Sequence, residues 1–366
     1  MTLLVLDQFS ELGGAQQCLL DLLPAMQSRG WQVAVGLPGD GPLAARLRGH
    51  RVETAAIDCG PYASGRKTLA DMGRFLAGSS RLARQVRELA ARFHPDAIYV
   101  NGPRLLPAVA GAGWPVIFHS HSFLPPGPAR TLCGFALRQA NARVIGNCRF
   151  VAGPWMRFAG AERVKVIYNG VPGPDAPVER PASAAFTVGC VGRIAPEKGQ
   201  LEFVRAAAIM HRELPQCRFS IHGASVLAGP AYEREVRAAA QALPVEFAGW
   251  SGDVNRALAG LDVLLVPSAP QEATTRVIPE AFAAGTPVIA FASGGIPEIV
   301  EHGRTGLLVK DAGEMARAAI ELLRGCRRRA AITAAARESW RERFTLGAWQ
   351  NSVLDFIGVH LCPSVA

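Results

Sequence analysis

The sequence predicts an α/β protein of two doubly wound domains, and three observations support this prediction. The chain has 366 residues, too many for one ordinary domain and enough for two that each bury a core. Continuously apolar runs of strand length alternate with amphipathic helical stretches, as they do when helices cover both faces of a parallel sheet. A segment rich in proline, residues 171–185, divides these runs into two sets and predicts an interdomain linker.

Taken in order, the apolar runs predict the strands of each domain. In the first domain, residues 1–170, they are TLLVLD, QVAVGL, DAIYV, PVIFH and RVIGN. In the second, residues 186–340, they are FTVGCVG, RFSIHG, VEFAG, VLLVP, PVIAF and GLLV. The strand ends of the two domains are expected to face a central cleft. Residues 341–366 are expected to form a helix that packs back on the first domain, followed by a frayed tail.

The composition describes a globular chain with a basic balance. Hydrophobic residues make up 49% and charged residues 19%, with a formal charge of +9 and a pI of about 9.5. This charge suits anionic partners such as nucleoside diphosphates or acidic lipid surfaces, and it suits a solvated arginine-rich surface equally well. The basic residues are dispersed and lack interleaved aromatic residues, which argues against a nucleic-acid partner.

Cysteine usage and hydropathy indicate a cytoplasmic protein. The eight cysteines are scattered and form no Cys-x-x-Cys pair, so free thiols in a reducing compartment are expected. The N-terminal MTLLVLDQFS lacks the features of a signal peptide, and no run reaches the roughly 18 apolar residues of a membrane span. Peripheral contact with the inner face of a membrane stays open.

Two glutamates and a proline mark a candidate site in the second domain. Glu272 and Glu280 have seven residues between them, and Pro279 is expected to begin a helix that ends near Gly285. Amides around Val277, Ile278 and Glu280 would then be free to bind a phosphate. The two carboxylates could hold sugar and ribose hydroxyl groups beside it. Alternatively, Glu280 only complements the helix dipole, worth about 0.3–1 kcal/mol.

The loop after the first strand of each domain also carries candidate residues, which are cations in the second domain and glycines in the first. Arg193 and Lys198 bracket a turn that opens a helix after FTVGCVG, where they could pair with a diphosphate or could be two ordinary surface charges. Gly13 and Gly14 lie between the first strand and the first helix, where backbone can approach a ligand. The Gly-x-Gly-x-x-Gly fingerprint is missing and no acidic residue closes the second strand, which disfavours a dehydrogenase.

Two histidines lie at the end of the predicted strand PVIFH, one as its last residue and one two residues later. His119 and His121 share one face by the period of two, and a metal pair would need a third ligand that the sequence does not show. Contact of a histidine with substrate and a purely structural role both stay open. The stretch RLARQVRELAARF, residues 81–93, has an apolar stripe flanked by arginines, which suits either an anionic membrane or a helix that covers the sheet.

These segments together resemble the retaining glycosyltransferases of family four, which have the GT-B architecture of two Rossmann-like domains. The resemblance covers nearly the whole chain and depends on the order and spacing of several motifs: GGAQ, HSHS, VIYNGV, VGRIAPEKG, EATTRVIPEAFAAGTPVIA, GGIPEIVEHGRTGLLV and RFTLGAWQNSVLDFI. Two places depart from the family pattern. Ala273–Thr275 replace an aromatic residue and a glycine, and Gly223–Ser225 replace Gly-x-Gly.

The resemblance implies a role for each candidate residue. Arg193 and Lys198 would hold the donor diphosphate, Glu280 the nucleotide ribose and Glu272 the donor sugar. His121 would contact the sugar near the reacting carbon, and Gly13 and Gly14 would border the phosphates or the acceptor.

The implied activity is retaining transfer of a sugar from a nucleoside-diphosphate sugar to a hydroxyl group of a carbohydrate, lipid-linked or small-molecule acceptor. No Asp-x-Asp lies near the candidate nucleotide site, so no metal is expected and the cations would stabilise the leaving diphosphate. A same-face displacement is expected, in which Glu272 forms no covalent intermediate. Two alternatives remain: a nucleotide-sugar epimerase of the same fold, or a non-catalytic binding partner.

Overall fold

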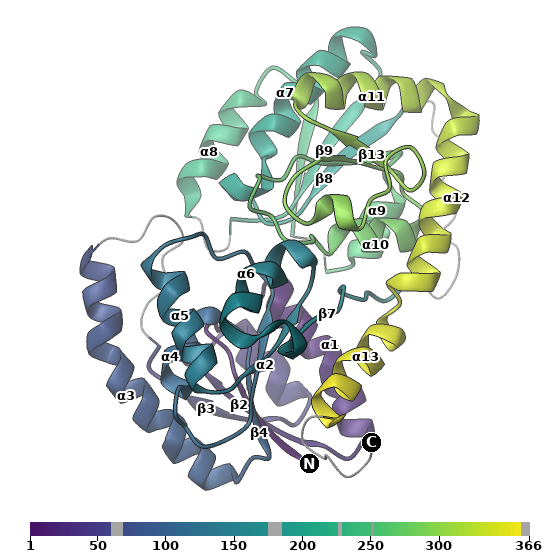
Figure 1. The fold of residues 1–366 in the computed structure, drawn as a ribbon. Coiled ribbons are helices and arrows are strands. Elements are labelled where there is room, and N and C mark those ends of the chain that lie inside the picture. Colours follow the sequence, from purple (N-terminus) through teal and green to yellow (C-terminus); the bar gives the residue numbers. More distant parts are fainter. Residues whose placement is uncertain (60–68, 175–184, 226–228, 251, 360–366) are drawn as a thin grey trace. The chain divides into compact units, whose positions relative to one another are not determined.

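The structure is a computed structural model that describes residues 1–59, 69–174, 185–225, 229–250 and 252–359. The chain divides into two compact units, Met1–Asn169 with the segment from Gly347, and Gly170–Leu346. Each unit has one parallel sheet with helices between successive strands (Figure 1). The α/β class is thus confirmed. Most of the expected linker at 171–185, and the expected tail after residue 359, lie outside the described residues.

The first unit has a seven-stranded sheet in the order β3-β2-β1-β4-β5-β6-β7. Its strands are β1 (Thr2–Leu6), β2 (Gln32–Leu37), β3 (Glu53–Ala56), β4 (Ala97–Val100), β5 (Val116–Ser120), β6 (Arg143–Gly146) and β7 (Val164–Val166). Its helices are α1 (Gly14–Ser28), α2 (Pro42–Gly49), α3 (Leu69–Phe93), α4 (Leu106–Val109), α5 (Pro128–Gln139), α6 (Arg149–Ala159) and α13 (Leu346–Val359). The sequence predicted all but the two edge strands, β3 and β7.

Helix α3 covers this sheet. Its apolar stripe enters the core, where Leu82 and Val86 are buried with strand residues such as Ile98 and Phe118, and Leu89 and Phe93 pack against them. Exposed ion pairs tie its arginines to carboxylates of the same unit: Arg81 with Asp58, Arg84 with Glu88 and Arg92 with Glu53. Of the two uses that the sequence left open for residues 81–93, the structure supports the helix that covers a sheet.

Helix α13 belongs to the first unit although it ends the described chain. Gln350 donates to the carbonyl oxygen of Asp21 on α1 at 2.6 Å, and Arg29 forms an ion pair with Asp355 at 2.8 Å. Its buried face includes Trp349, Val353 and Phe356, which have helical spacing. No helix of the described residues is both long enough and apolar enough to cross a membrane.

The second unit has a six-stranded sheet in the order β10-β9-β8-β11-β12-β13. Its strands are β8 (Thr187–Val191), β9 (Arg218–His222), β10 (Val245–Gly249), β11 (Val263–Val266), β12 (Val288–Phe291) and β13 (Leu307–Val309), all predicted from the sequence. Its helices are α7 (Gln200–Glu213), α8 (Pro230–Ala239), α9 (Val254–Ala259), α10 (Val277–Ala284), α11 (Ala312–Arg324) and α12 (Cys326–Arg343).

Each sheet has one point where the strand order reverses, between β1 and β4 in the first unit and between β8 and β11 in the second. Loops that leave the carboxyl ends of these two strands run in opposite directions, which opens a crevice where ligands of doubly wound proteins bind. Asp7 and Asn101 directly follow β1 and β4. The loops that carry Arg193 and Glu272 follow β8 and β11. The topology therefore places the candidate residues of each unit at its reversal point.

Candidate active site

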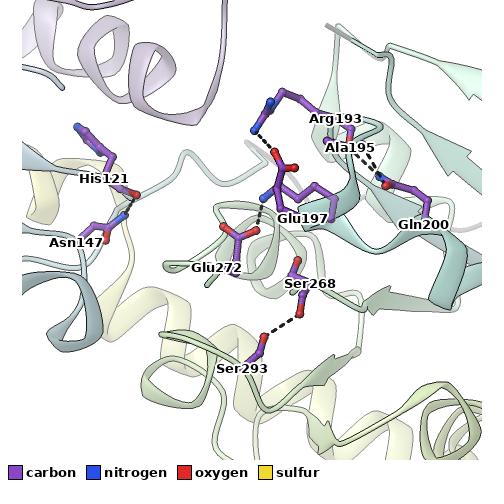
Figure 2. A network of polar contacts seen from close by, with 10 residues as sticks. His121, Asn147, Arg193, Ala195, Glu197, Gln200, Ser268, Glu272 and Ser293 are labelled. Atoms are coloured by element: carbon purple, nitrogen blue, oxygen red, sulfur yellow. Dashed lines mark hydrogen bonds and ion pairs between the residues drawn. The ribbon is translucent and has the colours of Figure 1, made fainter. Parts of the chain in front are cut away.

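The loop after β8, which carries Arg193 and Lys198, is held by hydrogen bonds from one buried glutamine. Gln200, at the start of α7, has no exposed surface. Its side-chain nitrogen donates to the carbonyl oxygen of Arg193 at 2.7 Å, and its side-chain oxygen accepts from the amide of Ala195 at 3.3 Å. Figure 2 shows these contacts. The loop backbone between Arg193 and the short helix Pro196–Lys198 is therefore fixed by the helix that follows it.

Gly199 fixes the same loop against the end of β11. Its φ is +71°, and a Cβ placed on it would lie 1.9 Å from the carbonyl oxygen of Pro267. The amide of Ala269 donates to the carbonyl oxygen of Glu197 at 2.9 Å, so two backbone contacts join the segments. Only glycine permits both this conformation and this approach.

Both cations of the loop already have carboxylate partners. The Lys198 ammonium lies 2.6 Å from Glu272 Oε2, and their side chains are 18% and 13% exposed. The Arg193 guanidinium lies 3.1 Å from Glu197 Oε1 (Figure 2). A bound diphosphate would thus have to draw the cations away from carboxylates. Strand order brings Lys198 and Glu272 together across 74 residues of sequence.

A second glycine supports the backbone of Glu272. The carbonyl oxygen of Glu272 accepts from the amide of Gly295 at 3.1 Å. Gly294 has a φ of +53°, and a Cβ there would lie 1.7 Å from the same oxygen. Ser293 Oγ also donates to the carbonyl oxygen of Ser268 at 2.9 Å. The glycine-rich motif GGIPEIV therefore positions the Glu272 loop, a role that the sequence pattern did not indicate.

The helix after Glu272 differs from the prediction. It begins at Val277, so Pro279 is its third residue and not its first. The amide of Ile278 donates to Thr275 O at 3.3 Å and that of Glu280 to Arg276 O at 3.1 Å, because a tight turn precedes the helix. The expectation of free amides at Ile278 and Glu280 is therefore wrong. Proline is tolerated here because the first-turn amides of a helix lack intrahelical acceptors.

Glu280 itself lies in the first turn of α10 beside Arg276. Its Oε1 is 3.4 Å from Arg276 Nε, and the side chains are 12% and 11% exposed. The pair is thus largely shielded from water, although it lies at a helix end. A carboxylate in this position has enough oxygen lone pairs to accept from two neighbouring hydroxyl groups of a ribose while it stays beside Arg276.

In the first unit, His121 belongs to a buried polar chain at the β1–β4 reversal point. Asp7, fully buried, accepts from Gln16 Nε2 at 2.9 Å and from Asn101 Nδ2 at 2.6 Å. Asn101 Oδ1 then lies 2.8 Å from His121 Nε2. Because the Asn101 amide must turn its nitrogen toward the carboxylate, its oxygen faces the histidine. Nε2 of His121 is therefore the protonated nitrogen.

His119 has a structural environment. Its ring stacks on that of His121 with centroids 3.9 Å apart, as the shared face predicted, and its Nδ1 is hydrogen-bonded to the Tyr99 hydroxyl. Burial holds the pKa of His119 well below its usual value, with a further contribution from the charge of His121. A neutral His119 is thus expected at physiological pH. In the described part of the chain no group of three or more potential metal ligands is found.

Gly13 and Gly14 lie where the first strand passes to α1, with Gly13 as the N-cap and Gly14 as the first helical residue. The backbone of Gly13 is extended, a conformation open to any residue. A Cβ on it would lie 3.0 Å from Gln16 Oε1, the side chain that donates to Asp7. In this structure Gly13 therefore leaves room for the Asp7 chain.

Three residues of these networks were missed from the sequence: Asp7, Asn101 and Gln200. Asp7 and Asn101 are the first polar residues after two apolar strands, and that position was the available signal. What the sequence did not show was that β1 and β4 are neighbours. Gln200 is a helix residue without any local mark of its role.

We expect the Asp7 carboxyl to make stability depend on pH. Burial raises its pKa from 3.8 to about 6, against the hydrogen bonds from Asn101, Phe9 and Gln16. The folded state therefore binds this proton more tightly than the unfolded state does, so the stability that this carboxyl contributes is fully present below about pH 4 and is lost as the pH rises through about 6. The change corresponds to about 3 kcal/mol. Denaturant unfolding of Asp7→Asn should lack this decline.

The matched control is Asp40→Asn, which removes a carboxylate that is 89% exposed in the same unit. It is expected to retain the pH dependence of the wild type. An equal decline in Asp7→Asn and the wild type would contradict the assignment to Asp7.

Comparison with known proteins identifies the family. The description "Glycosyltransferase Family 4" matches residues 12–172, and "Glycosyl transferases group 1" matches residues 185–325. The chain contains a Glycosyltransferase Family 4 domain followed by a Glycosyl transferases group 1 domain. The two matches fall one on each unit, and the resemblance drawn from the motifs is confirmed for the family and for its GT-B architecture.

Solved glycosyltransferase structures share the whole fold. Anabaena HepE, crystallised in complex with UDP-glucose, is 27% identical with a TM-score of 0.80, over 98% of this chain and 99% of that one. Sucrose-phosphate synthase from Thermosynechococcus elongatus has a TM-score of 0.80 at 19% identity, over 99% of this chain and 100% of that one, which shows the fold alone.

Two curated relatives come from Mycobacterium tuberculosis. A GDP-mannose-dependent alpha-(1-6)-phosphatidylinositol monomannoside mannosyltransferase is 35% identical over 177 residues, 42% of this chain and 44% of that protein. A D-inositol 3-phosphate glycosyltransferase is 33% identical over 256 residues, 62% of this chain and 50% of that protein. The chain thus spans about half the length of the curated relatives that it matches.

Proposed function

We propose that this protein transfers a hexose from a nucleoside-diphosphate sugar to a hydroxyl group of an acceptor. The observation that carries the proposal is the Lys198–Glu272 pair at the β8–β11 reversal point, with the ammonium 2.6 Å from the carboxylate. A donor has an anionic diphosphate beside a neutral sugar with hydroxyl groups. A cation and a carboxylate side by side match these two parts. The UDP-glucose complex of HepE, whose fold this chain shares, supports the same class of donor.

The leaving diphosphate would be stabilised by Lys198, Arg193 and the amide end of α10 at Val277. Preorganised positive groups stabilise developing negative charge without a metal ion when they are shielded from water. The exposures of 18% for Lys198 and 25% for the Arg193 side chain meet that condition in part, and a bound donor would cover them further. We therefore propose that transfer proceeds without a divalent cation.

Retention would follow from a same-face displacement. The acceptor oxygen attacks the anomeric carbon on the face from which the diphosphate departs, the bond from that carbon to the phosphate oxygen breaks, and the acceptor proton passes to the departing phosphate. Glu272 is bound to Lys198, so we assign it to the donor hydroxyl groups and not to a covalent intermediate. His121 would contact the transferred sugar. Trapping of a glycosyl–Glu272 adduct would overturn this assignment.

The acceptor class is carbohydrate, lipid-linked or small-molecule, with the lipid-linked class favoured by the phosphatidylinositol mannoside in the name of one relative. A lipid-linked acceptor would require peripheral contact with a membrane. All seven cysteines of the described residues are free thiols and six of them are buried, which supports a reducing, cytoplasmic location.

The proposal is tested by diphosphate release from UDP-, GDP-, ADP- and TDP-sugars in the presence of EDTA, with the wild type and Glu280→Ala. Release from one donor is expected. The variant should raise KM about 10- to 100-fold, because a hydrogen bond to a charged group contributes about 1.5–3 kcal/mol. Glu233→Ala is the matched control, since Glu233 forms a similar (i, i+4) pair with Arg237 on α8.

Each other outcome has a distinct meaning. Turnover of the nucleotide sugar without diphosphate release would favour an epimerase. Donor binding without turnover for any acceptor would favour a non-catalytic partner. Loss of activity in EDTA, with recovery on adding magnesium, would contradict the metal-independent step.

A further inference from the structure

Helices α5 and α6 of the first unit present aromatic side chains at the surface. Phe135 is 58% exposed and Leu132 is 38% exposed, both on α5. The Phe135 ring meets the half-buried ring of Phe158 on α6 edge-on, with centroids 6.3 Å apart. Gly134 allows this packing, since a Cβ there would lie 2.5 Å from the Phe158 ring.

Arginines continue this surface toward the loop before α5. The guanidinium of Arg157 lies over the Phe158 ring at 4.6 Å and that of Arg130 over the Phe123 ring at 4.9 Å. Phe123 in turn stacks on Phe150 with centroids 4.4 Å apart. We call these residues, with Leu132, Phe135 and Arg138, the α5–α6 surface.

The arginines of this surface come from a stretch of sequence without acidic residues. Between Asp96 and Glu162 the sequence holds six arginines and no aspartate or glutamate. In the part of the chain that the structure describes, Arg130 Nη2 is buried without a hydrogen-bond partner. Burial and the neighbouring charge of Arg157 also lower the pKa of Arg130. Such a buried nitrogen normally has an acceptor, so no carboxylate of the described residues offsets the charge of Arg130 at this atom.

We propose that the α5–α6 surface docks on the anionic phospholipid headgroups of a membrane. Arginines that bind phosphate oxygens beside exposed phenylalanine and leucine are the combination that holds a protein at a lipid–water interface. An acidic protein partner is the alternative occupant, and binding of the isolated protein to vesicles distinguishes a membrane from such a partner. The inference deepens the proposed contact with a lipid-linked acceptor, but it does not depend on the donor chemistry.

This location differs from the one that the sequence suggested. The arginines of α3 are paired with Asp58, Glu88 and Glu53, and its apolar stripe is used in the core. Helix α3 therefore provides a control with similar charge and a different prediction.

The test is co-sedimentation of the full chain, without donor, with vesicles of phosphatidylcholine alone and of phosphatidylcholine mixed with phosphatidylglycerol. The wild type should bind the mixed vesicles, and salt should weaken the binding. Arg138→Gln with Arg157→Gln should weaken it about 25-fold, at about fivefold for each arginine. Phe135→Ser should weaken vesicle binding about tenfold at low and at high salt alike, because the lost contact is apolar. All three residues are exposed, so the variants should fold.

The matched control is Arg81→Gln with Arg84→Gln on α3, which removes the same charge from the same unit and should bind as the wild type does. Equal losses in the two double variants, or no preference of the wild type for mixed vesicles, would overturn the proposal. So would loss of self-association in Phe135→Ser with unchanged vesicle binding, or thermal stabilisation by inorganic phosphate without any vesicle binding. Because no donor is used, these results are independent of the diphosphate-release assay.

Discussion

Replacing Lys198 with methionine is expected to lower kcat/KM for sugar transfer by about 10²–10³-fold, the cost of losing one preorganised group that stabilises a developing anion. Methionine keeps most of the length of the lysine stem. The loop that carries residue 198 should therefore keep the backbone contacts made by Gln200 and Gly199. What is lost is the ammonium that lies 2.6 Å from Glu272. Initial rates with the donor identified by diphosphate release give the measurement.

A second effect of this variant separates the charge of Lys198 from its shape. In Lys198→Met the Glu272 carboxylate loses its cation and faces the diphosphate, so affinity for the free nucleoside diphosphate should fall. Adding Glu272→Gln removes that repulsion and should recover affinity by about tenfold. The free diphosphate has no sugar, so the sugar contact proposed for Glu272 does not enter this comparison.

Lys310→Met is the control, because Lys310 is an exposed lysine of the same unit. It should leave kcat/KM within about twofold of the wild type, as surface substitutions usually do. If Lys198→Met shows the same small effect, the diphosphate role of Lys198 is wrong. If the double variant binds the diphosphate more weakly than Lys198→Met, the repulsion argument is wrong.

Most of the strands that the sequence predicted contain a run of buried residues, because helices exclude water from the two faces of a parallel sheet. The exception is β10, an edge strand whose sequence VEFAG was predicted although none of its residues is buried. The two missed strands, β3 with the sequence ETAA and β7 with VKV, lie at the edges of their sheet. Edge strands tolerate polar residues, so their pattern resembles that of a loop.

The candidate residues were predicted one by one, but their pairing was not. Local patterns marked Lys198 on a turn and Glu272 on a loop, yet their contact depends on β8 lying next to β11. The link from Asp7 through Asn101 to His121 depends in the same way on β1 and β4. Strand order follows from the packing of the whole sheet, and no short segment records it.

Pro279 misled the sequence reading for a local reason. Proline favours the first position of a helix, but any position in the first turn lacks an intrahelical acceptor for its amide. The apolar Val277 and Ile278 are buried and extend the helix toward its N-terminus.

Gly199→Ala is expected to destabilise the second unit by at least about 3 kcal/mol, because two costs add. A left-handed backbone at φ +71° costs alanine about 1–2 kcal/mol. In addition, the new Cβ would lie 1.9 Å from the carbonyl oxygen of Pro267, and backbone atoms cannot yield as a flexible side chain does. Thermal unfolding should show a Tm lower by about 6–12 °C.

Gly249→Ala separates the two costs. Gly249 has a φ of +72°, but nothing lies within 4 Å of a Cβ placed there, so only the backbone term should appear, about 1–2 kcal/mol. The two variants should also differ in activity. Relief of the clash in Gly199→Ala must move the loop of Lys198 away from Pro267, which would separate Lys198 from Glu272 and lower kcat even at temperatures where the protein is folded. Equal losses of stability in the two variants would mean that the approach of Gly199 to Pro267 does not hold the loop, and that another contact, such as the Gln200 hydrogen bonds, does.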